Sequence, residues 1–195
     1  MAQFGKDRFP ANYQSAVGMG ARQMLHQNSI ELATLLKENN ILQNSKNIFE
    51  LGSGPARNLY YIWLENQNLN LYCSDLFKDV SLESMHSEIK DKVTFFEGDS
   101  EDIIKTQLIP DLDIFLVSDH FMHLQYDKAK KIIDWVCDNW KPKHIMLREL
   151  KKEFETPNHP RLYHNYHRFL DNYEMIYEGD SAQDSCYFIW ILKRK

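Results

Sequence analysis

The stretch NIFELGSGPARNLYY, Asn47–Tyr61, decides the fold, because it joins a short apolar run to a helical pattern through a turn that holds Gly52, Gly54 and Pro55. The run before the turn, Asn47–Leu51, is typical of a buried strand, and proline is tolerated in the first turn of the helix that follows. Gly52 can adopt backbone angles closed to other residues, and Gly54 allows a ligand to approach the main chain. A turn that only reverses the chain would use the same residues, so the glycine pair alone does not establish a binding site.

Composition indicates one globular domain, residues 1–195, since 43% of the 195 residues are hydrophobic. The net charge of −5 provides no basic footprint for nucleic acid or an anionic membrane. Cys73, Cys137 and Cys186 are scattered without CxxC spacing, which favours reduced thiols in the cytoplasm over a disulfide framework or a zinc site. Neither a signal segment nor an apolar run of about 18 residues is visible, so we expect no membrane span.

Strand-like and helical patterns alternate along the rest of the chain. The strands are expected at 47–51, 70–75, 92–99, 111–119 and 143–150, and a hairpin at 173–179 and 186–193. The helices are expected at 29–40 (capped by Ser29), 56–66, 80–89, 100–108 (capped by Ser100), 126–140 and 161–172. This order predicts an α/β fold: a Rossmann-like, doubly wound, seven-stranded sheet, mostly parallel, with a C-terminal antiparallel hairpin and helices on both faces. Ligands are expected beyond the carboxyl ends of the strands.

Two acids stand at those ends. Glu50 closes the first strand beside the glycine turn, where a carboxylate suits an ammonium or sulfonium and repels a pyrophosphate. Asp75 closes the second strand, where it could accept both hydroxyls of a ribose or simply cap a helix.

The segments ELGSGPA, CSDLF, EGDSED and DIFLVSDHFMHL, in this order, resemble a class I S-adenosylmethionine-dependent methyltransferase of the small-molecule type. The resemblance covers most of 48–150, and the terminal hairpin fits its topology. One departure is Ala56, at a position that often holds a third glycine.

The resemblance implies a role for individual residues. Glu50, Gly52 and Gly54 would hold the methionine part of the cofactor, and Asp75 its ribose. Leu76 or Phe77 would lie against the adenine, Asp99 would bind the adenine amino group beside the Ser100 backbone, and the segment from Ser118 to His123 would line the methyl-transfer side. The implied reaction is O- or N-methylation of a small molecule, with S-adenosylhomocysteine as product.

An amine or alcohol acceptor usually requires a base, and the candidates are histidines. His120 and His167 are the preferred catalytic residues, with His123 and His164 as further candidates. His164 and His167 have a spacing at which two histidines can share a metal ion, but no neighbouring ligand reinforces it, so we expect no metal.

The sequence alone leaves other functions open. Tyr126 and Lys130 have the spacing of a short-chain dehydrogenase pair but lie after the fourth strand, without that family's glycine-rich turn. An RNA or protein methyltransferase, or a cofactor-binding scaffold without catalysis, would share the same motifs. Residues 1–28 precede the sheet and are expected either to cover the active site or to pack as an ordinary helix.

Overall fold

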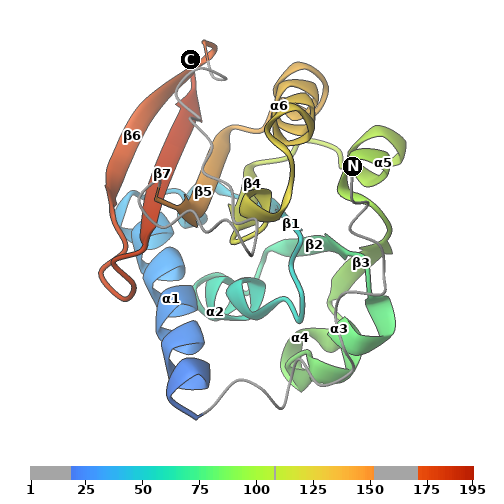
Figure 1. Cartoon of the computed structure of the whole chain (residues 1–195), viewed down its shortest axis with the longest axis vertical. Helices are drawn as coiled ribbons and strands as arrows, with labels where there is room; N and C mark the ends of the chain where they lie inside the picture. The colour runs from blue at the N-terminus through green and yellow to red at the C-terminus, as the bar shows by residue number, and fades with distance from the viewer. Residues whose placement is uncertain (1–18, 108, 152–170) are drawn as a thin grey trace.

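A computed structural model describes residues 19–107, 109–151 and 171–195 of the chain. Its centre is a seven-stranded sheet in the order β3-β2-β1-β4-β5-β7-β6 (Figure 1). Strands β1 to β5 run parallel to one another, and β7 is antiparallel to both β5 and β6. The predicted doubly wound sheet with its C-terminal antiparallel hairpin is therefore confirmed.

The central strands β1, β4 and β5 are short and buried, as strands covered on both faces should be, whereas the edge strands β3 and β6 are more exposed. Their bounds are β1 Asn47–Leu51, β2 Asn70–Asp75, β3 Val93–Glu97, β4 Ile114–Ser118, β5 His144–Leu150, β6 Tyr173–Asp180 and β7 Tyr187–Arg194.

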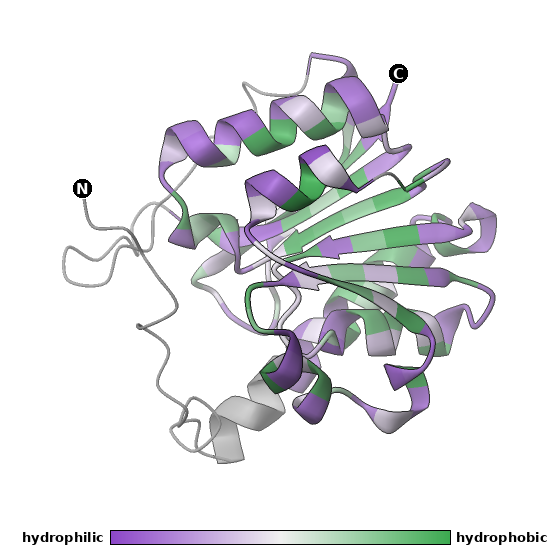
Figure 2. Cartoon of the chain, turned by 90° about the vertical axis from the view of Figure 1, so that its right-hand side faces the viewer, coloured by the Kyte–Doolittle hydropathy of each residue, from purple (hydrophilic) through white to green (hydrophobic). Residues whose placement is uncertain are grey.

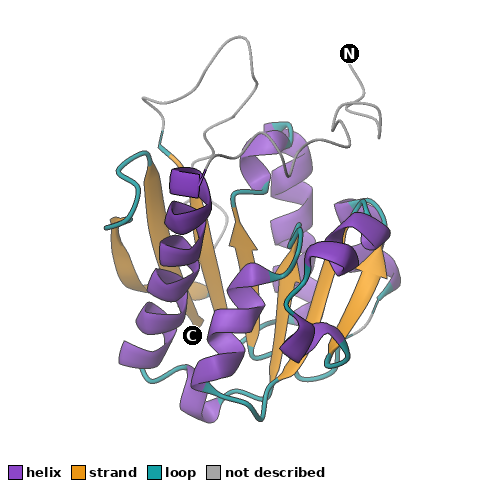
Figure 3. Cartoon of the chain, turned by 90° about the horizontal axis from the view of Figure 1, so that it is seen from below, coloured by secondary structure: helices purple, strands orange, loops and turns teal. Residues whose placement is uncertain are grey.

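Helices lie on both faces of the sheet (Figure 3). Their bounds are α1 Met19–Glu38, α2 Arg57–Glu65, α3 Lys78–Ser84, α4 Ser87–Lys90, α5 Ser100–Thr106 and α6 Tyr126–Trp135. Short 3-10 turns occupy Leu42–Asn44 and Phe121–His123, and a π-helical turn, Val136–Trp140, continues α6.

Two apolar layers enclose the sheet, which forms the apolar middle of the molecule (Figure 2). On one face, α5 and α6 pack over residues such as Phe49, Phe115 and Leu147. On the other face, α1, α2 and α4 pack over residues such as Ile48 and Leu116. Because side chains alternate along a strand, the polar residues Glu50, Ser118 and Arg148 continue the second face at the carboxyl ends of β1, β4 and β5.

Three details differ from the sequence-based expectations. Ser29 lies inside α1 rather than capping it, where its hydroxyl donates to Asn58 Oδ1 at 2.7 Å. Asp99, not Ser100, caps α5 by accepting a hydrogen bond from the Glu101 N–H. The single helix expected at 80–89 is broken into α3 and α4.

Helix α1 is tied to the turn between β6 and β7, as Figure 1 shows and as the contacts of Glu31 explain. The Glu31 carboxylate accepts hydrogen bonds from the Ser181 hydroxyl and the Ala182 N–H, both at 2.6 Å. This link ties α1, which packs on one face of the sheet, to the turn at the carboxyl edge. Within the described residues, no helix has the length and apolar character that crossing a membrane requires.

Candidate active site

The turn after β1 has an unusual backbone. Gly52, Gly54 and Ala56 have φ of 68°, 51° and 53°, all in the left-handed region that favours glycine. Ala56 carries a modest strain there, which explains why a glycine suits this position. The Gly54 N–H donates to Asp75 Oδ2 at 2.9 Å, and a Cβ added to Gly54 would meet nothing within 4 Å. The open side of Gly54 thus leaves room for a ligand, next to the carboxylate at the end of β2.

His120 explains the glycine at position 52. A Cβ on Gly52 would lie 2.2 Å from His120 Nδ1, so the imidazole packs directly on the turn. Its Nε2 is 2.7 Å from the Ser100 hydroxyl oxygen. Burial lowers the pKa of His120 to about 4, so the ring is neutral at neutral pH and, in this position, a weaker base than an ordinary histidine.

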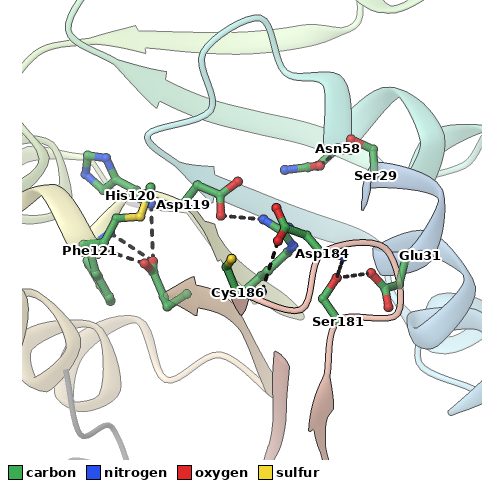
Figure 4. A network of polar contacts seen from close by, with 12 residues as sticks. Ser29, Glu31, Asn58, Asp119, His120, Phe121, Ser181, Asp184 and Cys186 are labelled. Carbon is green, nitrogen blue, oxygen red and sulfur yellow. Dashed lines mark hydrogen bonds and ion pairs between the residues drawn. The ribbon is translucent and has the colours of Figure 1, made fainter. Parts of the chain in front are cut away.

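A cavity of about 100 Å³ lies on the other side of the turn, between α1 and the ends of β1 and β4. It is lined by Asn28, Ser29, Glu50, Gly52, Ser53, Pro55, Arg57, Asn58, Ser118 and Asp119. Figure 4 shows three of these lining residues, Ser29, Asn58 and Asp119. Most of the polar side chains in this lining offer oxygen acceptors, and Arg57 is its one guanidinium.

Two buried oxygens in this lining lack a donor. Glu50 is 1% exposed and Asn28 5% exposed. Asn58 Nδ2 donates to Glu50 Oε1 at 2.6 Å, but Glu50 Oε2 and Asn28 Oδ1 have no hydrogen-bond partner in the described part of the chain. Burial raises the pKa of Glu50 to about 8, although the Asn58 hydrogen bond and the charge of Arg57 oppose the shift. A ligand with several N–H donors and a positive charge would satisfy both oxygens.

Asp99 already has two partners. Its Oδ1 accepts from the Glu101 N–H at 3.0 Å, and its Oδ2 accepts from Lys128 Nζ at 2.6 Å. Burial favours the neutral acid, but these two donors outweigh it and hold the pKa of Asp99 below its usual range. An adenine amino group would have to share this carboxylate with Lys128.

The segment after β4 is held by the last residues of β5. Glu149 accepts hydrogen bonds from the N–H groups of His120 (3.3 Å), Phe121 (2.9 Å) and Met122 (3.1 Å), as the dashed lines in Figure 4 mark. Arg148 Nη1 donates to Asp119 Oδ1 at 2.5 Å, and its carbonyl accepts from the Asp119 N–H. Asp119 has a φ of 59°, a strained conformation that these two contacts stabilise.

The structure therefore gathers most of the predicted site residues at one edge of the sheet. Glu50, Gly52, Gly54 and Asp75 surround the turn, and Ser100, His120 and Ser118 lie beside it. Leu76 follows β2 and is partly exposed, but no contact assigns it a role. His164 and His167 lie outside the described residues, and among those described no cluster suits a metal ion.

Sequence reasoning missed Asn28, Asn58, Asp119 and Glu149. Asn28 and Asn58 lie within helices, where an asparagine carries no signal of burial. Asp119 was visible only as part of the segment after the fourth strand. Glu149 lies in an apolar run, and an acid buried in such a run is the one signal that could have marked it.

The fold is that of class I methyltransferases. Superposition on an O-methyltransferase family protein from Burkholderia thailandensis gives a TM-score of 0.67 at 15% identity, covering 93% of this chain and 62% of that one. Superposition on magnesium protoporphyrin IX methyltransferase (ChlM) from Synechocystis, crystallised with S-adenosylhomocysteine, gives a TM-score of 0.70 at 14% identity and covers 92% of this chain and 89% of that one. Superposition on the small RNA methyltransferase HEN1 gives a TM-score of 0.64 at 16% identity and covers 84% of this chain and 25% of that one.

No model of a known protein family matches the sequence, and no curated protein sequence does so. The chain spans less than two thirds of the Burkholderia protein, and at these identities the similarity establishes the fold. The similarity confirms the fold implied by the sequence motifs. The similar structures include methyltransferases named for small molecules and for RNA.

Proposed function

We propose that this chain is a methyltransferase that uses S-adenosylmethionine to methylate a small molecule. The observation that carries the proposal is the cavity beside the Gly52 turn, with the unsatisfied oxygens of Glu50 and Asn28. The amino-acid end of S-adenosylmethionine carries an ammonium and a carboxylate. Glu50 and Asn28 fit the ammonium, and Arg57, which lines the same cavity, fits the carboxylate.

The cavity has the size of one end of the cofactor, because a site for a whole ligand of this kind usually measures about 300 Å³ or more. The remaining parts have candidate residues nearby. Asp75 would accept the ribose hydroxyls beside Gly54, and Leu76, Asp99 and Ser100 would contact the adenine. The His120 ring lies between Gly52 and Ser100, so binding of the adenosine part requires this side chain to move.

The bound cofactor would supply an electrophilic methyl group on a sulfonium. The work of the protein is then to hold the acceptor in line, exclude water and, for an amine or alcohol, remove a proton. Ser118 and the segment that follows it would line the side of the site where the methyl group is transferred. Glu149 holds this segment through its hydrogen bonds to the N–H groups of residues 120–122. We assign His120 the role of base, which the imidazole would take up once its ring has moved away from Gly52. We keep His167 as a second candidate.

A small-molecule acceptor fits the charge of the chain. A net charge of −5 disfavours a polyanionic substrate such as RNA, whose binding depends on lysine and arginine contacts to phosphate. We also infer a cytoplasmic location, from the scattered thiols.

Calorimetric titration of the full chain tests the cofactor. We expect saturable binding of S-adenosylmethionine and S-adenosylhomocysteine, and binding at least tenfold weaker for 5′-methylthioadenosine, which lacks the amino-acid end. Saturable binding of NAD with no heat from either cofactor form would overturn the proposal. Transfer of a labelled methyl group to fractionated metabolites would then separate an enzyme from a scaffold that only binds.

A further inference from the structure

Arg148, at the end of β5, is a buried cation that uses only part of its hydrogen-bonding capacity. The residue is 0% exposed. Its Nη1 donates to Asp119, but its Nε and Nη2 have no hydrogen-bond partner within the described residues. Buried polar groups are nearly always satisfied, so two unused donors on one buried side chain require an explanation.

The two unused donors lie on the same edge of the guanidinium. In an arginine side chain, the Nε–H and one Nη2–H are parallel and point the same way, which is the geometry that binds both oxygens of a carboxylate. Other parts of the group are in use. Nη1 donates to Asp119, and Cζ lies over the Tyr187 ring, 4.0 Å from its centre.

Arg148 lies next to the proposed cofactor site along the sheet edge. It pairs in register with Ser118, which lines the cavity, and its side chain shares the sheet face of Glu50 and Ser118. Beyond it, Met122, Leu150 and Tyr187 form a small apolar cluster. Acceptors for a cation at β1 and buried donors for an anion at β5 thus lie on the same face of the sheet, near its carboxyl edge.

We propose that the methyl acceptor carries a carboxylate, which binds side-on to Nε and Nη2 of Arg148 while its apolar part lies against Tyr187, Leu150 and Met122. This inference rests on the proposed methyltransferase function, whose site it extends. The Asp119 ion pair fixes the guanidinium so that its free edge keeps one orientation. The positive sulfonium of the cofactor would offset the additional negative charge beside Asp119 and Glu50.

A carboxylate probe tests the site directly. Benzoate, benzamide and inorganic phosphate are titrated separately into the full chain, with and without saturating S-adenosylhomocysteine. The Nε–H signal of Arg148, assigned through bonds to its own backbone, is followed by nuclear magnetic resonance. We expect a saturable shift with benzoate and at least tenfold weaker binding of benzamide and of phosphate.

Two variants complete the design. Arg148→Lys keeps a positive charge for Asp119 but removes the two-donor edge, so benzoate should bind at least tenfold more weakly. Arg194→Lys is the matched control, because Arg194 donates to the Lys141 carbonyl at the opposite end of the sheet, and it should bind benzoate as the wild type does. The shift in the wild-type protein is informative even if Arg148→Lys does not fold.

Equal binding of benzoate and benzamide, tighter binding of phosphate, or unchanged benzoate binding in a folded Arg148→Lys variant would each overturn the inference. In those cases Arg148 serves only to hold Asp119. Failure of the proposed function looks different: S-adenosylhomocysteine would not bind at all, whereas the benzoate titration without cofactor would still report on Arg148.

Discussion

At the scale of single residues, Asp75 has one contact in the structure and a second role in the proposed function. Its Oδ2 accepts the Gly54 N–H at 2.9 Å, and we propose that the carboxylate also binds the ribose hydroxyls. Hydrogen bonds to a charged group contribute about 1.5–3 kcal/mol. We therefore expect Asp75→Asn to weaken S-adenosylhomocysteine binding at least tenfold in calorimetry, with little change in thermal stability. Asp91→Asn, an exposed acid after α4, is the control, and equal affinity of the two variants would exclude Asp75 from the ribose site.

His120 is the residue whose role the structure changes most. From the sequence, a pKa near that of an ordinary histidine made it a plausible base at neutral pH. In the structure its pKa is about 4, and its ring covers Gly52. We expect His120→Ala to bind S-adenosylhomocysteine as tightly as the wild type or several-fold tighter, because the ring no longer competes for the space.

Turnover of the same variant should fall about 10²-fold if the displaced ring removes the proton of the acceptor. The rate of labelled methyl transfer to the identified acceptor measures this. Full turnover would remove His120 from the mechanism and direct attention to His167, and a more than tenfold loss of S-adenosylhomocysteine affinity would contradict the proposed competition.

At the scale of elements, the end of β5 determines the shape of the segment after β4. Glu149→Gln replaces one acceptor oxygen of this buried group by an amide donor, which would face a backbone N–H. We expect the free energy of unfolding to fall by about 2 kcal/mol, measured with urea, and the amides of residues 120–122 to exchange faster with solvent. Glu97→Gln, at the exposed end of β3, should change neither quantity. Unchanged exchange at 120–122 would show that Glu149 does not hold the segment.

The elements also show what a sequence can predict. Strand β1 matches its expected bounds, because a short apolar run between polar turns has few alternatives once both sheet faces are covered. The predicted helix caps were less reliable than the strand bounds. Asp99 and Ser100 are adjacent, and both aspartate and serine are common at helix N-caps, so only the geometry shows that Asp99 is the cap. Ser29 looked like a cap because serine favours that position, whereas its burial against Asn58 depends on the packing of α1 on α2, which no local pattern encodes.

The same limit applies to the site. The placement of Glu50, Gly52, Gly54 and Asp75 at one edge of the sheet could be predicted, because these residues end or follow strands in a fixed order. Asn28 could not, because it reaches the site from a helix whose position is fixed by long-range contacts such as that of Glu31 with Ser181.

At the scale of the whole molecule, buried acids determine how stability depends on pH. The pKa values of Glu50 and Glu149 are raised to about 8, so the folded chain keeps protons that the unfolded chain has released. These two groups therefore lower stability as pH rises from about 4.5 to 8. His120 acts in the opposite direction, since its lowered pKa reduces stability as pH falls from about 6.5 to 4.

Glu50→Gln isolates the first effect. Glutamine does not titrate, so between pH 5.5 and pH 8 the wild type should lose about 3 kcal/mol of unfolding free energy relative to the variant. Urea unfolding of both proteins at the two pH values measures the difference. The same loss in both proteins would show that Glu50 is ionised throughout this range.

Cofactor binding should change the protonation of the whole molecule through the same residue. With a pKa of about 8, Glu50 is largely protonated at pH 7. An ammonium placed against its Oε2 favours the carboxylate and lowers the pKa, so binding should release close to one proton at pH 7. Calorimetric titration of S-adenosylhomocysteine in buffers of different ionisation enthalpy measures the number of protons released.

Glu50→Gln should release none and bind at least tenfold more weakly, because its amide no longer provides a charge for the ammonium. Methylthioadenosine, which has no ammonium, is the matched ligand and should release no proton from the wild type. Proton release of the same size with both ligands would place the titrating group outside the Glu50 cavity.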